Sequence, residues 1–554
     1  MNELRTPILI VGGGTGGVAA ALAVARAGGT CIVTEPTDWV GGQLTSQAVP
    51  PDENRWIEGD DPRTRGANAS YIALRDAVRS WYRANRPLTD AARANPRLNP
   101  GNGWVSHLCA EPRVIHACLQ EMLEPHVATG RIRILLGYEP VSADVVGDEV
   151  RAVSFEHRQS QEPLSISADV VLDASELGDL LPLTGAEHVV GAEHRDRHGE
   201  MHGHPDGDDP DDVQAISWCF ALEHRPGENH TIARPDRYDF WRDYIPHFDV
   251  PWPGKLFGWT VLGAEGREHR LFRFVPWPDE PEPNEWEMWR YRRIVDRSLY
   301  RRESAAKHPD VSLINMVQMD YFLKSTLKDG RRGHDDAFNE AREQSLCLLY
   351  WMQTEAPRLD GTDKVGFPGL RLRGEEIGTS DGLAMHPYIR ESRRLIARTI
   401  VTEAHVGYEQ RKAEKRPGMD IEPLGCGEPF ADSVGIGHYR LDLHPSCGGR
   451  HGVYAQATPF RVPLGALIPV RLTNLLASGK CLGVTHVTNG GYRLHPVEWA
   501  IGEAAGALAQ WCVGGRRTPT EVHERRSELR AFQKHLLSFG AALSWPWEQG
   551  AGLE

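Results

Sequence analysis

Short apolar runs and a helical pattern alternate at the start of the chain. Residues 6–11 (TPILIV) form a short β-rich apolar run, as expected of a buried parallel strand. An Ala-rich helical stretch follows at 18–27, and a second apolar run at 30–34 (TCIVT) predicts another strand. The pattern therefore predicts a strand–helix–strand unit at the N-terminus.

Similar patterns recur later in the chain. The predicted helices cover 71–83, 114–127 and 497–513, and the predicted strands cover 131–136, 141–146, 150–156, 166–173 and 475–479. The strands 141–146 and 150–156 read as a hairpin around Gly147-Asp148. We expect a loop between residues 483 and 496.

A glycine cluster joins the first strand to the first helix. Gly12, Gly14 and Gly17 have the spacing GxGxxG. In this motif the first glycine permits the tight turn, the second lets the backbone approach a pyrophosphate, and the third lets helix and strand pack closely. The helix N-terminus offers free N–H groups to the phosphates. Glu35 ends the second strand, 18 residues after Gly17, where it can accept hydrogen bonds from a ribose. The unit predicts a dinucleotide site.

The segment after Glu35 bears on which dinucleotide binds. Residues 39–46 (WVGGQLTS) contain two glycines and small hydroxyl residues, which let the backbone pass close to a bulky planar ligand. This segment resembles the flavin-side loop of the glutathione-reductase-like FAD proteins, whereas a classical NAD dehydrogenase has no such loop there. The resemblance favours FAD.

Several longer motifs resemble the FAD-dependent oxidoreductase family. They are GGGTGG (12–17), GGQLTSQ (41–47), DASELGDLLPLTG (173–185), NMVQMDY (315–321), HPYIRESRR (386–394), DSVGIGHYRLDLHPS (432–446) and the long run 479–509. The resemblance implies FAD bound in an extended form, with its isoalloxazine ring between two domains. It does not fix a substrate. NMVQMDY departs from the family's pattern at three central positions, which implies a different pocket if this segment faces the substrate.

The resemblance also implies a fold and a set of cofactor-binding residues. The expected fold class is α/β, with a Rossmann-like FAD-binding domain of the glutathione-reductase type and an inserted α+β substrate domain. The FAD-binding domain would comprise 1–50, 100–190 and 440–515, and the substrate domain 191–439, with an insertion at 51–99 and a C-terminal helical tail at 516–554. The cofactor-binding residues would be Gly12, Gly13, Gly14, Thr15, Gly16, Gly17, Glu35, Pro36, Gly41, Gly42, Gln43, Leu44, Thr45, Arg113, Pro140, Val141, Ala174, Ser175, Glu176, Gly483, Pro496, Val497 and Glu498.

Flavin chemistry needs few protein groups, because the cofactor accepts the hydride and the protein orients substrate and moves a proton. His495 and His486 flank the expected flavin loop, and an ordinary His pKa suits proton transfer near neutrality. Arg493 could hold a substrate carboxylate or a flavin oxygen. Its alternative is an internal salt bridge with Glu498 or Glu503.

Three further residues are weighed for catalysis. Tyr388 and Arg390 are the members of segment 386–394 that could reach a substrate. The alternative is that this segment is an interdomain strut of Arg–Glu pairs. His444 is a further acid–base candidate. For both histidines at the flavin loop, the alternative is a role in shaping the loop.

Charge and composition exclude some function classes. The chain has 62 Lys plus Arg and 76 Asp plus Glu, a net charge of −14, which argues against a general nucleic-acid binder. No apolar stretch is long enough to span a membrane, and no signal sequence precedes the glycine cluster, so we expect a cytoplasmic protein without membrane attachment. The nine Cys lie far apart without a CxxC pair, which disfavours a zinc ribbon or a disulfide reductase.

One segment invites a metal interpretation. Residues 194–212 contain four His and many acidic residues, among them the pair His202-x-His204. Surrounding Gly and Pro favour a solvated mobile loop, a candidate lid over the substrate pocket, and we predict no metal.

The sequence thus predicts an FAD-dependent oxidoreductase that oxidises a small organic substrate by hydride transfer, as a dehydrogenase or an oxidase. The alternatives are a monooxygenase using transiently bound NAD(P)H and, in another class, a non-catalytic flavin-binding protein. The excess of Arg over Lys suggests a GC-rich bacterial genome, and a role in specialised metabolism is a guess. The substrate, the electron acceptor and the oligomeric state, with a homodimer as one option, stay open.

Overall fold

The structure is a computed structural model. It describes residues 2–548 except 60–65, 264–265, 267, 275, 277–285, 329, 360–361, 363 and 422–423. Parts of the predicted insertion, substrate domain and C-terminal tail therefore lie outside the described residues.

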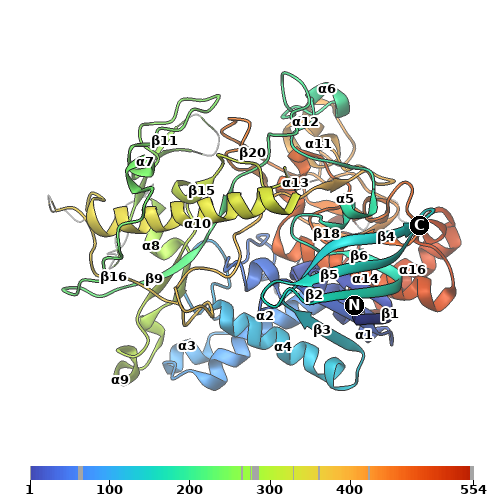
Figure 1. The fold of residues 1–554 in the computed structure, drawn as a ribbon, viewed down its shortest axis with the longest axis horizontal. Coiled ribbons are helices and arrows are strands. Elements are labelled where there is room, and N and C mark those ends of the chain that lie inside the picture. Colours follow the sequence, from blue (N-terminus) through green and yellow to red (C-terminus); the bar gives the residue numbers. More distant parts are fainter. Residues whose placement is uncertain are drawn as a thin grey trace.

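A seven-stranded sheet forms one end of the molecule, on the right in Figure 1. Its order is β3-β2-β1-β6-β5-β4, and β22 pairs with β6. The strands β1, β2, β3, β6 and β22 pair in parallel, whereas β4 and β5 form an antiparallel hairpin. The strands are β1 (Asn2–Val11), β2 (Cys31–Glu35), β3 (Ile132–Leu136), β4 (Tyr138–Val146), β5 (Glu149–His157), β6 (Pro163–Asp173) and β22 (Leu475–Ala477). The predicted N-terminal unit and the predicted hairpin are confirmed.

Two helices pack closely beside this sheet. α1 (Thr15–Arg26) begins in the glycine cluster, and α14 (His495–Gly515) packs against α1. A Cβ on Gly502 would lie 2.0 Å from the carbonyl oxygen of Gly16, and a Cβ on Gly506 would lie 2.2 Å from that of Ala20. Only glycine at these α14 positions permits such a close approach of the two backbones.

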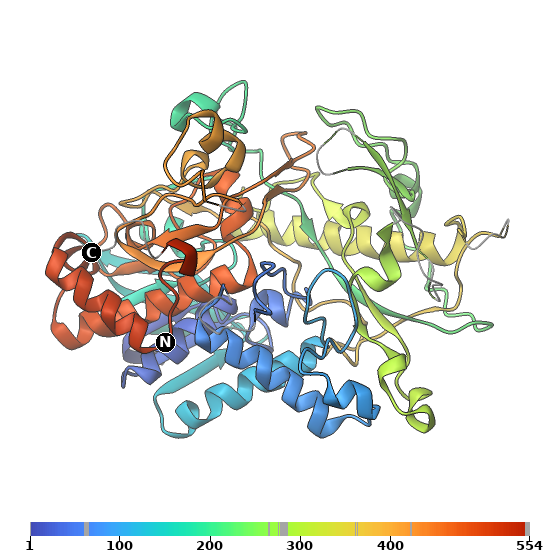
Figure 2. The ribbon, with the colours of Figure 1, turned by 180° about the vertical axis from the view of Figure 1, so that it is seen from behind.

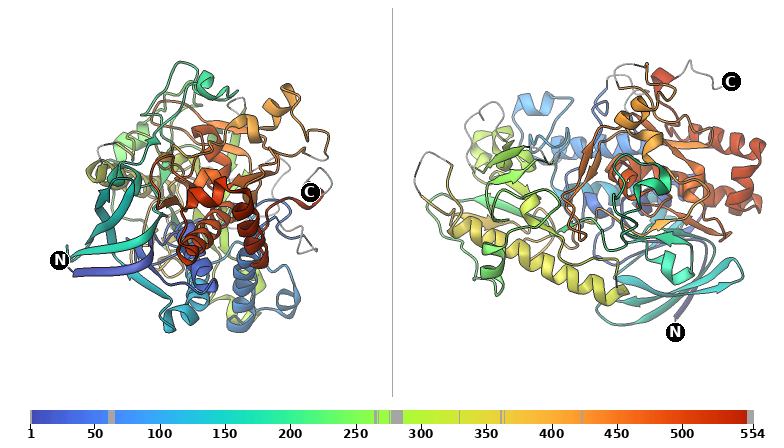
Figure 3. Two further views of the ribbon diagram at one scale, coloured as in Figure 1. Left: turned by 90° about the vertical axis from the view of Figure 1, so that its right-hand side faces the viewer. Right: turned by 90° about the horizontal axis from the view of Figure 1, so that it is seen from above.

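A second group of elements lies at the other end of the molecule (Figures 1 and 2). Its four-stranded antiparallel sheet has the order β13-β14-β9-β16, with β13 (Arg293–Val295), β14 (Val311–Ile314), β9 (Phe220–His224) and β16 (Leu370–Leu372). The long helix α10 (Gly330–Thr354) runs through this part, far from the C-terminal helices (Figure 3). A second apolar core here contains Trp241, Trp289 and Phe274. The structure is thus mixed α/β with a largely parallel sheet, and the division into domains stays a prediction.

One loop prediction is corrected. The expected loop between 483 and 496 contains helix α13 (His486–Tyr492), where Thr485 and Thr488 form a capping box. Residue propensities do not predict this helix, because Gly490 and Gly491 lie within it and glycine disfavours helix interiors. The predicted C-terminal helical tail contains two helices, α15 (Pro519–Glu524) and α16 (Arg526–Ser538).

The predicted insertion contains α2 (Ala69–Asn85), as expected, and also a short α3 (Asp90–Ala94). The predicted helix at 114–127 is α4 (Pro112–Ala128). The remaining helices and strands are α5 (Leu180–Thr184), β7 (His188–Val189), α6 (Arg195–His198), β8 (Ile216–Ser217), α7 (Tyr238–Asp243), β10 (Thr260–Leu262), β11 (His269–Arg273), β12 (Trp286–Glu287), α8 (Met288–Tyr291), α9 (Arg302–Ala305), β15 (Asp320–Tyr321), β17 (Arg394–Leu395), α11 (Glu403–Val406), α12 (Tyr408–Ala413), β18 (Ser433–Gly437), β19 (Leu441–Leu443), β20 (Val453–Ala455) and β21 (Phe460–Pro463).

Segment 194–212 is more structured than the predicted solvated loop. It contains α6, and Glu200 is buried, where its carboxylate accepts hydrogen bonds from Thr485 Oγ1 at 2.6 Å and from the Glu403 backbone N–H at 2.8 Å. His202 Nδ1 lies 2.5 Å from the Glu403 carboxylate. Pairing with residues more than 200 positions away, which no local pattern reveals, explains the difference.

The nine Cys are all free thiols, and only Cys447 is partly exposed. Within the described residues, no helix is both long and apolar enough to cross a membrane.

Candidate functional site

A cavity of about 280 Å³ lies at the carboxyl ends of β1, β2 and β6. In open α/β sheets this edge is where ligands bind. Helix α10 and segment 386–393 complete the wall through His334, Phe338, His386 and Arg393. Of the predicted cofactor-binding residues, those that line it are Gly12, Gly14, Glu35, Pro36, Gly42, Pro140, Val141, Ala174, Ser175 and Glu176.

The glycine cluster has the backbone geometry that the motif requires. Gly12 has φ +101°, and a Cβ there would lie 2.3 Å from the carbonyl oxygen of Ala174. A Cβ on Gly17 would lie 2.0 Å from the carbonyl oxygen of Gly12, so this glycine permits the close helix–strand contact. Any side chain at these positions would displace the turn.

Glu35 lines this cavity at the end of β2. Its carboxylate accepts hydrogen bonds from the Gly13 N–H at 2.9 Å and from the N–H and hydroxyl of Thr37 at 2.9 and 2.6 Å. Burial raises its pKa to about 7, although these hydrogen bonds oppose the shift. The carboxylate is therefore held rigidly at the cavity wall.

The loop after β2 packs against the start of α14. Gly41 and Gly42 have φ +113° and +54°, and the Thr15 hydroxyl donates to the Gly41 carbonyl at 2.9 Å. Gln43 donates to the Arg493 carbonyl at 3.1 Å and also to the Glu498 carboxylate. The other predicted residues of this region, Gly13, Gly16, Leu44 and Thr45, are buried around the cavity without lining it.

A buried charge cluster lies where this loop meets the sheet. Lys480 Nζ donates to Glu176 at 2.5 Å and to Glu498 at 3.4 Å. Burial raises the pKa of Glu498 to about 7, whereas Lys480, acting against burial, lowers the pKa of Glu176. Glu176 Oε1 is buried without a hydrogen-bond donor among the described residues, and it faces Gly14 and Gly42. A bound ligand that carries hydroxyl groups, as FAD does, would supply the missing donor, so these residues fit the cofactor.

Some predicted cofactor residues lie away from the cavity. Arg113 Nη2 pairs with Glu111 at 2.6 Å and is more than one-third exposed. Gly483 packs against Ala397, and Pro496 and Val497 are buried in the first turn of α14. Arg113 thus forms a local salt bridge instead of lining the cavity.

A second cavity, of about 160 Å³, lies between the two groups of elements. Tyr388, Arg390 and Arg493, three of the predicted catalytic residues, line it. Asn315, Met316 and Val317, from the segment that departs from the family pattern, line it too. Because His386 lines the first cavity and Tyr388 the second, this segment contributes to both walls.

His486 and His495 line neither cavity. His486 is buried with its Nδ1 2.9 Å from the Glu391 carboxylate, which raises its pKa against the effect of burial. His495 Nδ1 accepts a hydrogen bond from the Asp52 N–H at 3.0 Å, and burial lowers its pKa well below the ordinary value, so the ring is neutral. Both positions match the loop-shaping alternative.

The arginines of the second cavity have different partners from those we considered. Arg493 donates to the Tyr388 hydroxyl at 2.6 Å and pairs with Asp442 at 3.3 Å, rather than with Glu498 or Glu503. Arg390 pairs with Asp320 at 3.0 Å. The strut of Arg–Glu pairs exists at the next arginines, since Arg394 pairs with Glu391 and Glu193.

His444, the further acid–base candidate, lines the second cavity, and the buried Asp320 lies directly behind it, a partner outside the predicted catalytic set. His444 Nδ1 lies 2.7 Å from Asp320 Oδ2. Asp320 is fully buried, and Ser217 donates to its other oxygen at 2.6 Å. Burial would raise its pKa, but Arg390 and His444 hold the pKa below the ordinary value. Asp320 is thus an anion that orients the His444 ring. The two residues belong to two of the family-like motifs, and that shared membership was the available signal.

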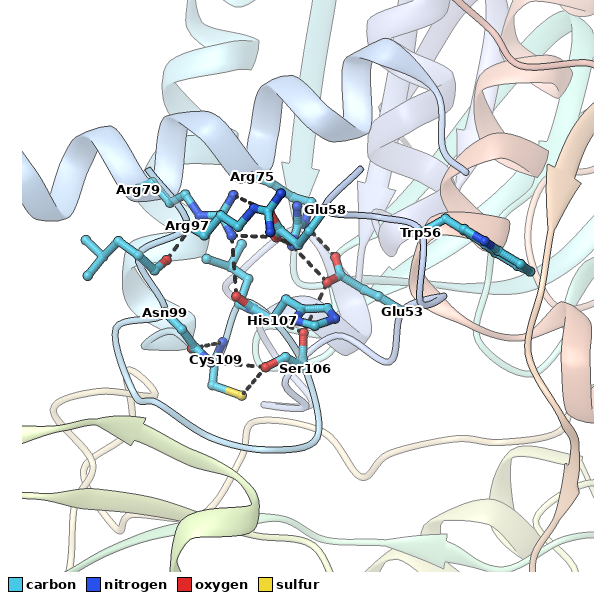
Figure 4. Close-up of polar contacts among 12 residues, drawn as sticks. Glu53, Trp56, Glu58, Arg75, Arg79, Arg97, Asn99, Ser106, His107 and Cys109 are labelled. Atoms are coloured by element: carbon cyan, nitrogen blue, oxygen red, sulfur yellow. Dashed lines mark hydrogen bonds and ion pairs between the residues drawn. The ribbon is translucent and has the colours of Figure 1, made fainter. Parts of the chain in front are cut away.

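Asp52 also lines the second cavity, and the chain around it is anchored by a buried network (Figure 4). Its neighbour Glu53 pairs with Arg75 Nε at 2.8 Å and accepts from the Ser106 hydroxyl at 3.1 Å. Arg79 and Arg75 both pair with Glu58 in the same network. Glu53 is therefore fixed to α2, and this fixes the position of the Asp52 carboxyl in the cavity wall. No sequence pattern singled out this residue.

Comparisons with known proteins identify the family of this chain. The family model described as FAD dependent oxidoreductase matches residues 7–536. No curated protein matches the chain. Among solved structures, a mutant of the E. coli quinol fumarate reductase has 10% identity and a TM-score of 0.31, with 97% of this chain and 74% of that chain covered.

Two other similar structures are a geranylgeranyl bacteriochlorophyll reductase-like protein from Thermoplasma acidophilum and the anhydrotetracycline hydroxylase of Streptomyces rimosus. The first has 10% identity and a TM-score of 0.32, with 97% of this chain and 84% of that chain covered. The second has 16% identity and a TM-score of 0.22, with 43% and 41% covered. The family match spans nearly the whole chain, so the protein belongs to the FAD-dependent oxidoreductase family and is an enzyme with FAD as its cofactor.

Proposed function

We propose that the enzyme oxidises a small organic substrate in the second cavity by hydride transfer to flavin bound in the first. The observation that carries the proposal is His444, which lines a cavity of about 160 Å³ together with Arg493 and lies 2.7 Å from the buried Asp320 carboxylate. Bound FAD would accept a hydride from a C–H bond next to oxygen or nitrogen.

A residue of the cavity would accept the proton that the substrate releases during the oxidation. When a C–H bond next to an O–H or N–H group is oxidised to a C=O or C=N bond, the hydride leaves with two electrons and the O–H or N–H proton must go to a base. His444 would take this proton at the nitrogen that is not bonded to Asp320, and the ionised Asp320 would stabilise the resulting cation. Asp52 and Asp442 are two carboxyls in the wall of the same cavity.

The cofactor site would follow the glutathione-reductase arrangement. Glu35 would bind the ribose, the glycine cluster and the N-terminus of α1 the pyrophosphate, and Pro140 and Val141 the adenine side, while Glu176 and loop 41–45 would contact the flavin half. Residues 191–439 would form the inserted substrate domain. This assignment is supported by the residues that line the first cavity.

An anaerobic absorbance experiment tests the function. The purified holoenzyme should keep its oxidised flavin bands with NADH or NADPH and lose them with an organic substrate. Rapid bleaching by a reduced pyridine nucleotide alone would contradict the proposal and favour a monooxygenase or a reductase. If an organic substrate reduces the flavin, later reoxidation by air with release of peroxide would identify an oxidase rather than a dehydrogenase.

A further inference from the structure

The second cavity contains a guanidinium group with two nitrogens that have no hydrogen-bond partner among the described residues. Arg292 lines the cavity, and its Nε and Nη1 atoms are buried without a hydrogen-bond partner among the described residues. Its Cζ atom lies 5.2 Å from the centre of the Tyr291 ring. A buried charge is costly unless it is paired and hydrogen-bonded. Arg292 therefore lacks the anion that a buried arginine requires.

The neighbouring charges do not supply this anion. Asp442 pairs with Arg493 at 3.3 Å, and its carboxylate lies 3.7 Å from His444. Asp320 is already shared by Arg390 and His444. Asp52 is the neighbouring charge that most strongly raises the pKa of Arg292 against the effect of burial. Within the described part of the chain, however, no acidic oxygen, Asp52 included, lies within the 4.0 Å of an ion pair with Arg292. The carboxylates of Asp442 and Asp320 are thus paired with Arg493 and Arg390 and not with Arg292.

The size and lining of the cavity limit the ligand. Its volume of about 160 Å³ is close to the ~150 Å³ of an apolar cavity that binds benzene. Apolar and aromatic side chains form much of its wall, including Phe272, Met288, Tyr291, Tyr439 and Tyr454. A guanidinium presents a planar fork of N–H donors that matches the two oxygens of a carboxylate.

We propose that the second cavity binds a small substrate that carries a carboxylate, and that Arg292 is the partner of this carboxylate. The inference rests on the proposed function, because it names the substrate class of the same site. The substrate would be a carboxylic acid of roughly the size of benzene, with a hydroxyl or amine on the carbon that is oxidised.

Binding of matched carboxylates and amides to the oxidised holoenzyme tests the inference without turnover. Calorimetry would compare benzoate with benzamide and propionate with propionamide, which differ little in shape. The wild-type enzyme should bind at least one carboxylate ten times or more tightly than its amide. Arg292→Gln should remove this preference, and Arg292→Lys, which keeps the charge without the fork, should keep part of it.

Arg440→Gln is the matched control. Arg440 is exposed, stacks 4.6 Å from the ring of the cavity residue Tyr454, and does not line the cavity, so its loss removes the same charge without the direct contact. This variant should keep the preference. Flavin content and melting temperature would establish that each variant is folded.

Equal binding of each carboxylate and its amide, binding of neither, or a preference that survives Arg292→Gln would overturn the inference. The proposed function fails separately. Tight carboxylate binding by a flavin that no organic substrate reduces would leave the inference and overturn the function. Flavin reduction by neutral substrates, without tighter binding of carboxylates than of amides, would overturn the inference and leave the proposed function.

Discussion

Two histidines line the second cavity, and their partners separate their roles. His444 Nδ1 faces the buried Asp320 carboxylate at 2.7 Å, whereas His451 Nε2 faces the backbone carbonyl of Gly263 at 3.0 Å. A carboxylate supports a proton on the imidazole far better than a carbonyl does. The base in this cavity is therefore expected to be His444.

His444→Asn should slow flavin reduction by substrate about 10²–10⁴-fold, the usual contribution of a general base. Rapid-mixing absorbance under anaerobic conditions would measure the rate, and dithionite reduction should stay unchanged. His451→Asn is the matched control, since it changes a histidine of the same wall and should lower the rate much less. Equal losses in the two variants would remove His444 from its assigned role.

A buried carboxyl far from both cavities predicts a pH dependence of stability. Burial raises the pKa of Glu200 from 4.5 to about 7. The unfolded chain then loses this proton near pH 4.5 and the folded chain only near pH 7, so the folded state loses stability as the pH rises between these values. The full loss is about 3 kcal/mol at 1.36 kcal/mol per pKa unit.

Glu200→Gln removes this titration. Relative to the wild type, the variant should therefore gain up to about 3 kcal/mol of stability between pH 5 and pH 8. Urea unfolding at both pH values would measure the difference. A stability difference that is the same at the two pH values would contradict the raised pKa.

At the scale of elements, the seam between α1 and α14 positions the glycine cluster. Because a Cβ on Gly502 would lie 2.0 Å from the Gly16 carbonyl oxygen, Gly502→Ala should force the helices apart, at a cost of about 1–3 kcal/mol. It should also lower the FAD content, since α1 begins in the nucleotide loop. Melting temperature and the ratio of flavin to protein absorbance would measure both effects.

The same helix offers its own control. Near its C-terminus a Cβ on Gly514 would meet only the Gln510 side chain, at 3.9 Å, so Gly514→Ala should be neutral or slightly stabilising. If Gly514→Ala lowered the FAD content as much as Gly502→Ala, the loss would reflect helix α14 in general rather than its seam with α1.

Elements with a local signature could be predicted from the sequence, and contacts between distant segments could not. The Gly12–Gly17 turn and the hairpin at Gly147 follow from residue types a few positions apart. His444 and Asp320 are 124 positions apart, and Arg292 lies in a segment without a motif. The sequence favours His486 and His495 as acid–base groups because they flank the predicted loop, but tertiary packing points both side chains toward buried partners.

At the scale of the whole molecule, the first cavity draws its wall from both groups of elements. Glu35 and Pro140 belong to the large sheet, whereas Phe338 lies on α10. A ligand that binds only the folded chain stabilises it by RT ln(1 + [L]/Kd), about 2.7 kcal/mol at 100 times Kd. Added FAD should thus raise the melting temperature of the cofactor-free protein.

FMN lacks the adenosine half that would reach Glu35 and Pro140, so it should raise the melting temperature less than FAD at equal concentration. Differential scanning calorimetry with both ligands would measure the two shifts. An equal shift with FMN would place the adenosine half outside the first cavity.

The distribution of the nine thiols has a practical consequence. Burial raises the pKa of Cys447, the most accessible of them, to about 12, so that at neutral pH this thiol is almost entirely in its protonated, unreactive form. The other eight sulfurs are inside the protein. A single cysteine engineered at an exposed turn, for example Ser160→Cys, would therefore be the preferred attachment point for a dye, without removal of any native cysteine.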